Sequence, residues 1–233
     1  MGTLYLIPVP LGPVDPESCL PAETLAVARR LDTFIAERAK TARAHLKAMG
    51  HPRPLQELVI QELNEHTKAA DIPALLAPLS HGQDVGLMSE AGCPAVADPG
   101  AELVKAAHRQ GIGVVPLVGP SSILLALMAS GLGGQRFCFH GYLPAKEPER
   151  SKRIHELETT ARKNASAQLF IETPYRSAAL LDAMIAALSP GTLISVGADL
   201  SLPGQLVKTL TAKDWRGKSG MLKDRLVVFG IGV

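Results

Sequence analysis

The chain alternates between short aliphatic runs and longer stretches in which apolar side chains recur every three or four residues. The first pattern predicts buried strands and the second predicts amphipathic helices. In the N-terminal half, strands are expected at 3–12, 33–37, 84–90 and 112–119, and helices at 21–32, 38–50, 67–82, 101–111 and 120–131. This alternation favours a parallel α/β sheet. Residues 51–66 are mixed and polar, and the pattern assigns no element to them.

The C-terminal half repeats the alternation with longer strands. Strands are expected at 136–144, 167–173, 192–201 and 224–233, and helices at 146–164 and 174–188. A polar, glycine-rich break, "GLGGQ", separates the two halves. We therefore place a domain boundary between Gly119 and Gly134 and expect an N-terminal α/β domain of residues 1–119 and a C-terminal α/β domain of residues 120–233.

Composition narrows the class of protein. Hydrophobic residues make up 46% and charged residues 20% of the 233, so the chain can bury a core and is not disordered. A net charge of +2 gives no overall nucleic-acid signature, so any polyanion must bind to a local patch. Cys19, Cys93 and Cys138 are far apart, which argues against a zinc site or a disulfide framework. We expect a reduced, cytoplasmic protein without a membrane segment.

Three turns made of small residues and prolines follow predicted parallel strands. They are Pro8–Gly12, Ser89–Gly100 and Gly119–Ser122. In open α/β sheets, ligands bind at the carboxyl ends of strands, and small side chains let the backbone approach a ligand closely. Proline makes each turn rigid before the ligand arrives. We therefore predict a wall that holds a ligand by its main chain. The alternative is that these are only tight connections between strand and helix.

Other ligand and catalytic motifs are missing from the sequence. No GxGxxG follows the first strand, and the chain lacks GxxxxGK[ST], GxSxG and HExxH. The missing motifs therefore argue against a dinucleotide-binding protein, a P-loop nucleoside triphosphatase, an α/β hydrolase and a zinc protease. We expect His45 and His155 to be solvated on polar helix faces. His140 lies beside Gly141 on a strand and could line a cleft, but a structural role is favoured.

Five motifs, taken in order, resemble a known family. They are "GTLYLIPVPLG", "SEAGCPAVADPGAELVKAA", "VVPLVGPSSILLALMASGL", "FHGYLP" and "IETPYR". Together they resemble the tetrapyrrole methylase superfamily of S-adenosylmethionine-dependent methyltransferases, and within it the branch that methylates a ribose 2′-hydroxyl of small-subunit ribosomal RNA. The resemblance spans nearly the whole chain. It implies two α/β domains, one with a largely parallel and one with a mixed sheet, S-adenosylmethionine in the cleft between them, and a homodimer.

The resemblance also implies which residues contact the methyl donor. Carried over by position, they come from the three turns and from two later segments: Pro10, Ala91, Gly92, Cys93, Val96, Ser121, Ser122, Glu172 and Leu200. The small residues of the second turn would make room for the donor, with backbone groups on its polar atoms and Val96 on an apolar face.

The chain departs from the family pattern at several positions. Gly92-Cys93-Pro94 stands where the tetrapyrrole branch usually has Gly-Asp-Pro and the RNA branch has Thr in the middle. Glu90 stands where the RNA branch has Asp, and the stretch 9–13 reads Val-Pro-Leu-Gly-Pro instead of Thr-Pro-Ile-Gly-Asn. That branch also often carries an extra C-terminal segment. The donor site itself looks intact, so these departures leave the identity of the methyl acceptor more open than the methyl-transfer chemistry.

Methyl transfer asks little covalent chemistry of a protein. The methyl group on a sulfonium is already electrophilic, so holding donor and acceptor in line is the main task, and it can supply about 7–11 kcal/mol. No metal is required. A hydroxyl acceptor also needs a base, for which Glu90 and Glu172 are the candidates. The alternatives are that Glu90 caps the turn after its strand and that Glu172 pairs with Arg176.

A basic stretch after the second strand is the candidate contact for the acceptor. Its cations lie on one predicted helix: Arg38, Lys40, Arg43 and Lys47. The RNA branch has a comparable charged, Arg-bearing segment here, whereas the alternative is a solvated helix face. "RSKR" at 150–153 is a second candidate for phosphates.

Two rival functions remain open: methylation of a tetrapyrrole or other small molecule, and a non-catalytic nucleotide-binding protein.

Overall fold

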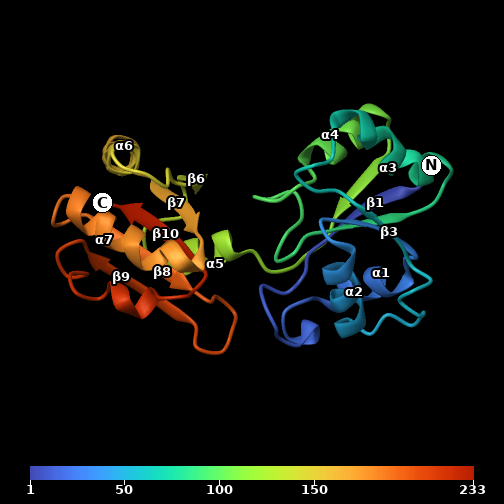
Figure 1. Ribbon diagram of the computed structural model, residues 1–233, viewed down its shortest axis with the longest axis horizontal. Coiled ribbons are helices and arrows are strands. Elements are labelled where there is room, and N and C mark those ends of the chain that lie inside the picture. The colour runs from blue at the N-terminus through green and yellow to red at the C-terminus, as the bar shows by residue number, and fades with distance from the viewer. The chain divides into compact units, whose positions relative to one another are not determined.

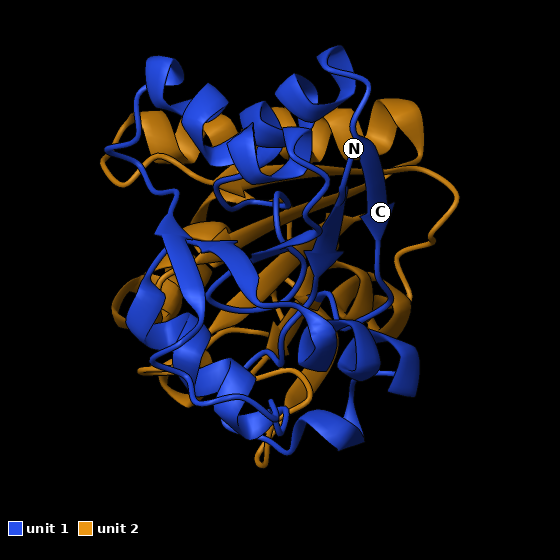
Figure 2. Cartoon of the chain, turned by 90° about the vertical axis from the view of Figure 1, so that its right-hand side faces the viewer, with its two compact units in different colours: residues 1–121 blue, residues 122–233 orange.

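The computed structural model describes residues 1–233, which form two compact units, residues 1–121 and 122–233. Figure 2 colours the first unit blue and the second orange. Each unit has its own five-stranded sheet and its own hydrophobic core. No helix combines the length and the apolar character that crossing a membrane would need.

The first unit is built on a parallel sheet whose strand order is β3-β2-β4-β1-β5. Its strands are β1 (Thr3–Ile7), β2 (Thr33–Ala36), β3 (Val59–Glu62), β4 (Val85–Met88) and β5 (Gly113–Pro116). Its helices are α1 (Ala22–Arg30), α2 (Ala39–Ala48), α3 (Ile72–Ser80) and α4 (Ala101–Arg109), with 3₁₀ turns at Pro16–Ser18 and Ala69–Asp71. One core cluster joins α1 and α2 to one face of the sheet, and another joins α3 and α4 to the opposite face (Figure 1).

The second unit has a mixed sheet with the strand order β6-β7-β10-β8-β9. Only β6 and β7 pair in parallel, and the other neighbours are antiparallel. The strands are β6 (Phe137–Tyr142), β7 (Ala167–Glu172), β8 (Leu193–Ala198), β9 (Leu206–Thr211) and β10 (Val227–Gly232). The helices are α5 (Ser122–Ser130), α6 (Glu149–Asn164) and α7 (Ser177–Ala187), with 3₁₀ turns at Pro174–Arg176 and Ser219–Leu222. One parallel and one mixed sheet confirm the expected fold class.

The sequence pattern failed at the edges of both sheets. β3 lies inside residues 51–66, to which no element was assigned, and β9 was missed altogether. Both are edge strands with one neighbour, so neither shows the aliphatic run of a buried strand. The strand expected to be buried at 112–119 is β5, another edge strand, and most of its residues are exposed.

β4 is the central strand of the first unit's sheet, flanked by β1 and β2, and all four of its residues are buried. Gly86, in its middle, leaves room for two larger neighbours. A β-carbon at Gly86 would lie 2.7 Å from Cδ1 of Ile7 and 2.8 Å from Cδ1 of Phe34. The close packing of three strands therefore depends on the missing side chain.

Gly86→Ala is expected to lower the free energy of unfolding of the whole chain by about 1–3 kcal/mol, because the added methyl overpacks the core. Urea unfolding followed by circular dichroism measures this. Gly113→Ala is the matched control in β5, since its β-carbon would come no closer than 4.0 Å to Thr3. Equal stability of the two variants would mean that Ile7 and Phe34 can move aside without cost.

Candidate functional site

The three small-residue turns that follow β1, β4 and β5 are joined to one another. Val9 and Gly92 form an isolated antiparallel bridge, in which each N–H donates to the other residue's carbonyl at 3.0 and 3.1 Å. The Cys93 thiol donates to the Pro120 carbonyl at 3.4 Å, and burial raises the pKa of this thiol. The first turn is thus paired with the second and the second with the third. The structure brings together the turns that the sequence predicted would share one edge.

Two glycines make this close approach possible. A β-carbon at Gly119 would lie 2.3 Å from Cβ of Pro8, so any side chain would push the first and third turns apart. Gly92 has a φ of +73°, and its β-carbon would lie 3.1 Å from Cδ2 of Leu11 and 3.5 Å from the Pro120 carbonyl oxygen. The backbone of each glycine therefore packs directly against residues of another turn, and the glycine itself contributes no side chain to the contact.

The second turn, Ser89–Gly100, has an unusual backbone conformation and an internal hydrogen bond. The Ser89 hydroxyl donates to the Gly92 carbonyl at 3.3 Å. Ala95 and Ala97 both have a positive φ, which non-glycine residues adopt rarely. Val96 between them is 48% exposed, which is unusual for a branched apolar residue in a tight turn. The turn therefore presents backbone, methyl groups and one valine to its surroundings.

The remaining donor-site candidates of the turns differ in exposure. Pro10 is buried, and Ala91 is exposed. Ser121 and Ser122 are half-buried, and neither hydroxyl has a hydrogen-bond partner within the chain. Two hydroxyls thus remain available beside the joined turns.

Glu90, one of the two candidate bases, is held by helix α2. The Thr41 hydroxyl donates to its Oε2 at 2.9 Å, and Nε2 of His45 donates to its backbone carbonyl at 3.0 Å. The carboxylate is therefore bound by a helix, and it does not cap the turn after β4. The expectation that His45 is merely solvated is wrong, because its ring is half-buried and positions Glu90.

Asp98 is the functional candidate that sequence reasoning missed. Its carboxylate is half-buried and makes no hydrogen bond or ion pair within the chain. Burial, followed by repulsion from Glu37 and Glu90, raises the pKa of Asp98 to about 6. The available signal was a carboxylate among small residues and prolines, in a segment already suspected of binding a ligand.

Comparison with known proteins places this geometry in a family. The model of the family described as tetrapyrrole (corrin/porphyrin) methylases matches residues 3–215. The chain belongs to the tetrapyrrole methylase family. Its members take their methyl group from S-adenosylmethionine, so the chain is an S-adenosylmethionine-dependent methyltransferase.

Two curated relatives carry the name "Ribosomal RNA small subunit methyltransferase I". The protein from Mesorhizobium japonicum is 36% identical over 210 residues, which are 90% of this chain and 67% of the relative. The protein from Escherichia coli O157:H7 is 32% identical over 86% of this chain and 66% of its own length. The chain thus spans about two thirds of these relatives. The crystal structure of the methyltransferase CobJ, 21% identical, matches all of this chain and 94% of its own with a TM-score of 0.64, which supports the fold.

The second unit of this tetrapyrrole methylase contributes Glu172 and Leu200 as candidates. Glu172 is buried at the end of β7, and its Oε1 accepts hydrogen bonds from Arg176 Nη2 at 2.6 Å and from the Thr173 N–H at 2.7 Å. The alternative in which Glu172 pairs with Arg176 is thus the one that the structure shows. Leu200 follows β8, is also buried, and packs against Gly197.

The four cations of the basic stretch are not equivalent. Arg38 precedes α2, and Arg38, Lys40 and Lys47 are exposed without an ion pair. Arg43 is half-buried, and its Nε donates to the Leu55 carbonyl at 3.3 Å. Lys40 and Lys47 are two helical turns apart and share a face of α2. Arg43 is therefore partly committed to the fold, whereas the other three are available to a ligand.

The second phosphate candidate, residues 150–153 on α6, is largely neutralised. Arg150 pairs with Glu147 at 2.8 Å, and Arg153 pairs with Glu156 at 3.1 Å. Arg153 also donates to Nδ1 of His140. His140 in turn contacts the buried Gln168, which agrees with a structural role for this histidine.

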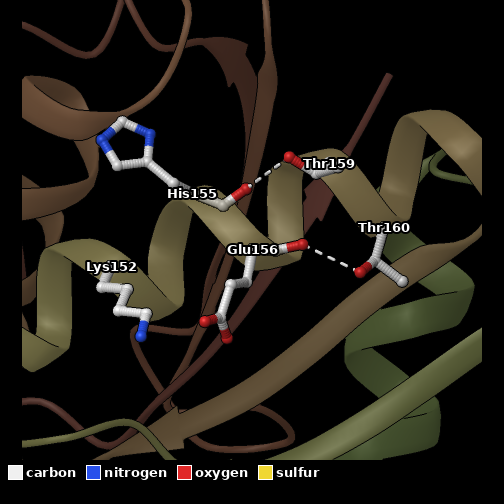
Figure 3. A pocket seen from close by; sticks show the side chains of 5 residues that line it. All are labelled: Lys152, His155, Glu156, Thr159 and Thr160. Carbon is white, nitrogen blue, oxygen red and sulfur yellow. Dashed lines mark hydrogen bonds between the residues drawn. The ribbon is translucent and has the colours of Figure 1, made fainter.

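Lys152, the remaining cation of this stretch, borders a shallow pocket on α6. Figure 3 shows that its lining comes from one helix and consists of Lys152, His155, Glu156, Thr159 and Thr160. The two threonine hydroxyls donate to the carbonyls of His155 and Glu156, at 2.9 and 2.8 Å. These hydroxyls already donate to carbonyls of their own helix and do not converge on a ligand, so we assign no binding site to this pocket.

The raised pKa of Asp98 makes stability depend on pH. The unfolded carboxyl titrates near about 4 and the folded one at about 6, so the wild type loses stability as the pH rises through this window. Asp98→Asn removes that loss. Relative to the wild type, it is expected to gain about 1 kcal/mol between pH 4.5 and 7.5 after allowance for solvent screening.

Urea unfolding at the two pH values measures this gain. The exposed Asp182→Asn is the control and should follow the wild type at both. An Asp98→Asn variant that also runs parallel to the wild type would contradict the shifted titration.

Proposed function

We propose that this tetrapyrrole methylase transfers the methyl group of S-adenosylmethionine to ribosomal RNA of the small subunit, with a ribose 2′-hydroxyl as the acceptor. The observation that carries the proposal is the wall of three joined turns, made of backbone and small side chains, in a chain more than 30% identical to relatives named for that RNA. The modified atom rests on the resemblance to the RNA branch.

The turns fit a flat, polar donor. At Gly92 and Gly119 a β-carbon would meet the side chains of Leu11 and Pro8, so the missing side chains let the turns approach one another. The N–H and carbonyl groups around Cys93 supply donors and acceptors without bulk, and the exposed Val96 supplies an apolar contact. The free hydroxyls of Ser121 and Ser122 would bind the donor's polar groups.

Catalysis in this proposal is mainly positioning. S-adenosylmethionine supplies a methyl group that is already electrophilic. The chain's own task is to hold the donor rigidly against the turns, so that the acceptor oxygen can approach in line with the breaking bond. The rigidity comes from the Val9–Gly92 bridge and the Cys93–Pro120 hydrogen bond, which exist before any ligand binds.

The acceptor is proposed to contact α2. Lys40 and Lys47 lie on one exposed face of α2 and Arg38 precedes the helix, on a chain of nearly neutral net charge, and no carboxylate of the chain neutralises these cations. Unpaired cations of this kind bind phosphates, and RNA presents one phosphate per nucleotide.

We also propose a homodimer, as the family resemblance implies. Leu124 and Met128, one turn apart on α5, are 51% and 80% exposed and would suit such an interface.

Methyl transfer from labelled S-adenosylmethionine tests the function directly. Incorporation into small-subunit ribosomal RNA is expected, with none into uroporphyrinogen III. Gly92→Val should abolish it, because a branched side chain resists a φ of +73° and fills the space next to Leu11. Calorimetry should show donor binding near a 1:1 ratio in the wild type and none in the variant, with unchanged circular dichroism. Incorporation into the tetrapyrrole alone would reverse the assignment of the acceptor.

The double variant Lys40→Ala/Lys47→Ala tests the RNA contact. RNA affinity is expected to fall, and the slope of log affinity against log salt to flatten by about 0.7–0.9 for each lost phosphate contact. Donor affinity should stay the same. The matched control is Lys163→Ala/Lys213→Ala, two exposed lysines of the second unit. Equal slopes for the two double variants would remove α2 from the acceptor site.

A further inference from the structure

We propose that Asp98 accepts the proton of the acceptor hydroxyl, a role that rests on the function proposed above. A hydroxyl oxygen gains a third bond when it takes a methyl group, and its proton must then leave. Neither Glu90 nor Glu172, the two carboxylates that the sequence suggests as bases, is free in the structure. Asp98 lies in the same turn as the proposed donor residues Ala91, Gly92, Cys93 and Val96.

The contacts of the two glutamates argue against them. Glu90 accepts a hydrogen bond from the Thr41 hydroxyl on Oε2, and its backbone carbonyl is bound by His45. Glu172 is 4% exposed at its side chain, and its Oε1 is shared by Arg176 and Thr173. Glu172 forms an ion pair with Arg176, and this pair raises the pKa of Arg176. Both carboxylates are therefore engaged in contacts within the fold.

Asp98 is in the opposite situation. It is half-buried, yet no N–H, hydroxyl or cation of the chain binds its carboxylate. A carboxylate that is withdrawn from water without a partner costs free energy, and a fold retains such a group where it serves function. The position is also fixed, because Ala97 before it has a positive φ and Pro99 after it is rigid.

The electrostatic surroundings suit a proton acceptor. The charged groups that act on Asp98 are Glu37, which follows β2, and Glu90, which follows β4. With burial, they bring the pKa of Asp98 to about 6. A base with this pKa is ionised at neutral pH and holds a proton better than an ordinary aspartate does. Glu37 also lacks a hydrogen bond, but it lies outside the donor turn, so we assign it only the repulsion.

The step balances without another reactant. The acceptor oxygen forms a bond to the methyl carbon while the bond from that carbon to sulfur breaks. The sulfur keeps the electron pair and becomes a neutral thioether. The hydroxyl proton passes to the Asp98 carboxylate and then to water.

The test combines Asp98→Asn and Glu37→Gln in the full chain, with methyl incorporation into small-subunit ribosomal RNA as the assay. Asp98→Asn should lower kcat by about 10²–10⁴-fold while calorimetry shows unchanged affinity for S-adenosylmethionine. In the wild type, kcat/KM should rise with pH through an acidic limb near 6. Glu37→Gln should remain active and move that limb to lower pH, because it removes a negative charge that raises the pKa of Asp98.

Each result decides the inference. Full activity of Asp98→Asn would overturn it, and so would a loss of donor affinity that accounts for the lost activity. If Asp98→Asn does not fold, the pH profile of kcat/KM in Glu37→Gln still tests the inference. An acidic limb at the same pH as in the wild type would exclude Asp98 as the titrating base. A wild type that binds the donor but methylates no ribosomal RNA would contradict the proposed function instead, and with it the role that rests on it.

Discussion

The pair of backbone hydrogen bonds between Val9 and Gly92 is the constraint on which the candidate site depends. It joins the ends of two neighbouring strands, β1 and β4, after both have left the sheet. The bridge needs Gly92 at a positive φ, and it fixes the carbonyl on which the Ser89 hydroxyl rests. It also places Cys93 within reach of Pro120, so the third turn follows from the first two. The same contacts therefore hold this part of the fold together and form the proposed binding surface.

A wall built from main chain has an electrostatic consequence. Its small residues screen little, so the carboxylates at the same sheet edge act on one another, and Asp98 carries the cost. Glu90 accepts a hydrogen bond from Thr41 on helix α2. Asp98 has no such partner within the chain, and it is left with a raised pKa. Similar residues near one proposed reaction acquire different chemistry from their partners alone.

The sequence predicted the fold class and the joined turns because both follow from local signals. β4 reads as an uninterrupted apolar run, and each turn is marked by prolines and glycines. The edge strands β3 and β9 carry no such run, since one side of each has no neighbour. The roles of His45, Arg43 and Asp98 could not be predicted either. The first two depend on hydrogen bonds to Glu90 and Leu55, and the third depends on burial and on repulsion from Glu37 and Glu90, which arise only in the folded chain.

Helix α2 connects the proposed acceptor and donor contacts within a single unit. Its exposed face carries Lys40 and Lys47, while Thr41 and His45 hold the side chain and the carbonyl of Glu90 at the start of the second turn. Because α2 is hydrogen-bonded to the start of the turn, an acceptor bound on α2 would be held in a fixed place relative to that turn. Methyl transfer asks for alignment more than for chemical groups, and this connection supplies alignment. That explains why a half-buried histidine, which catalyses nothing in the proposed reaction, lies between the cations and the turns.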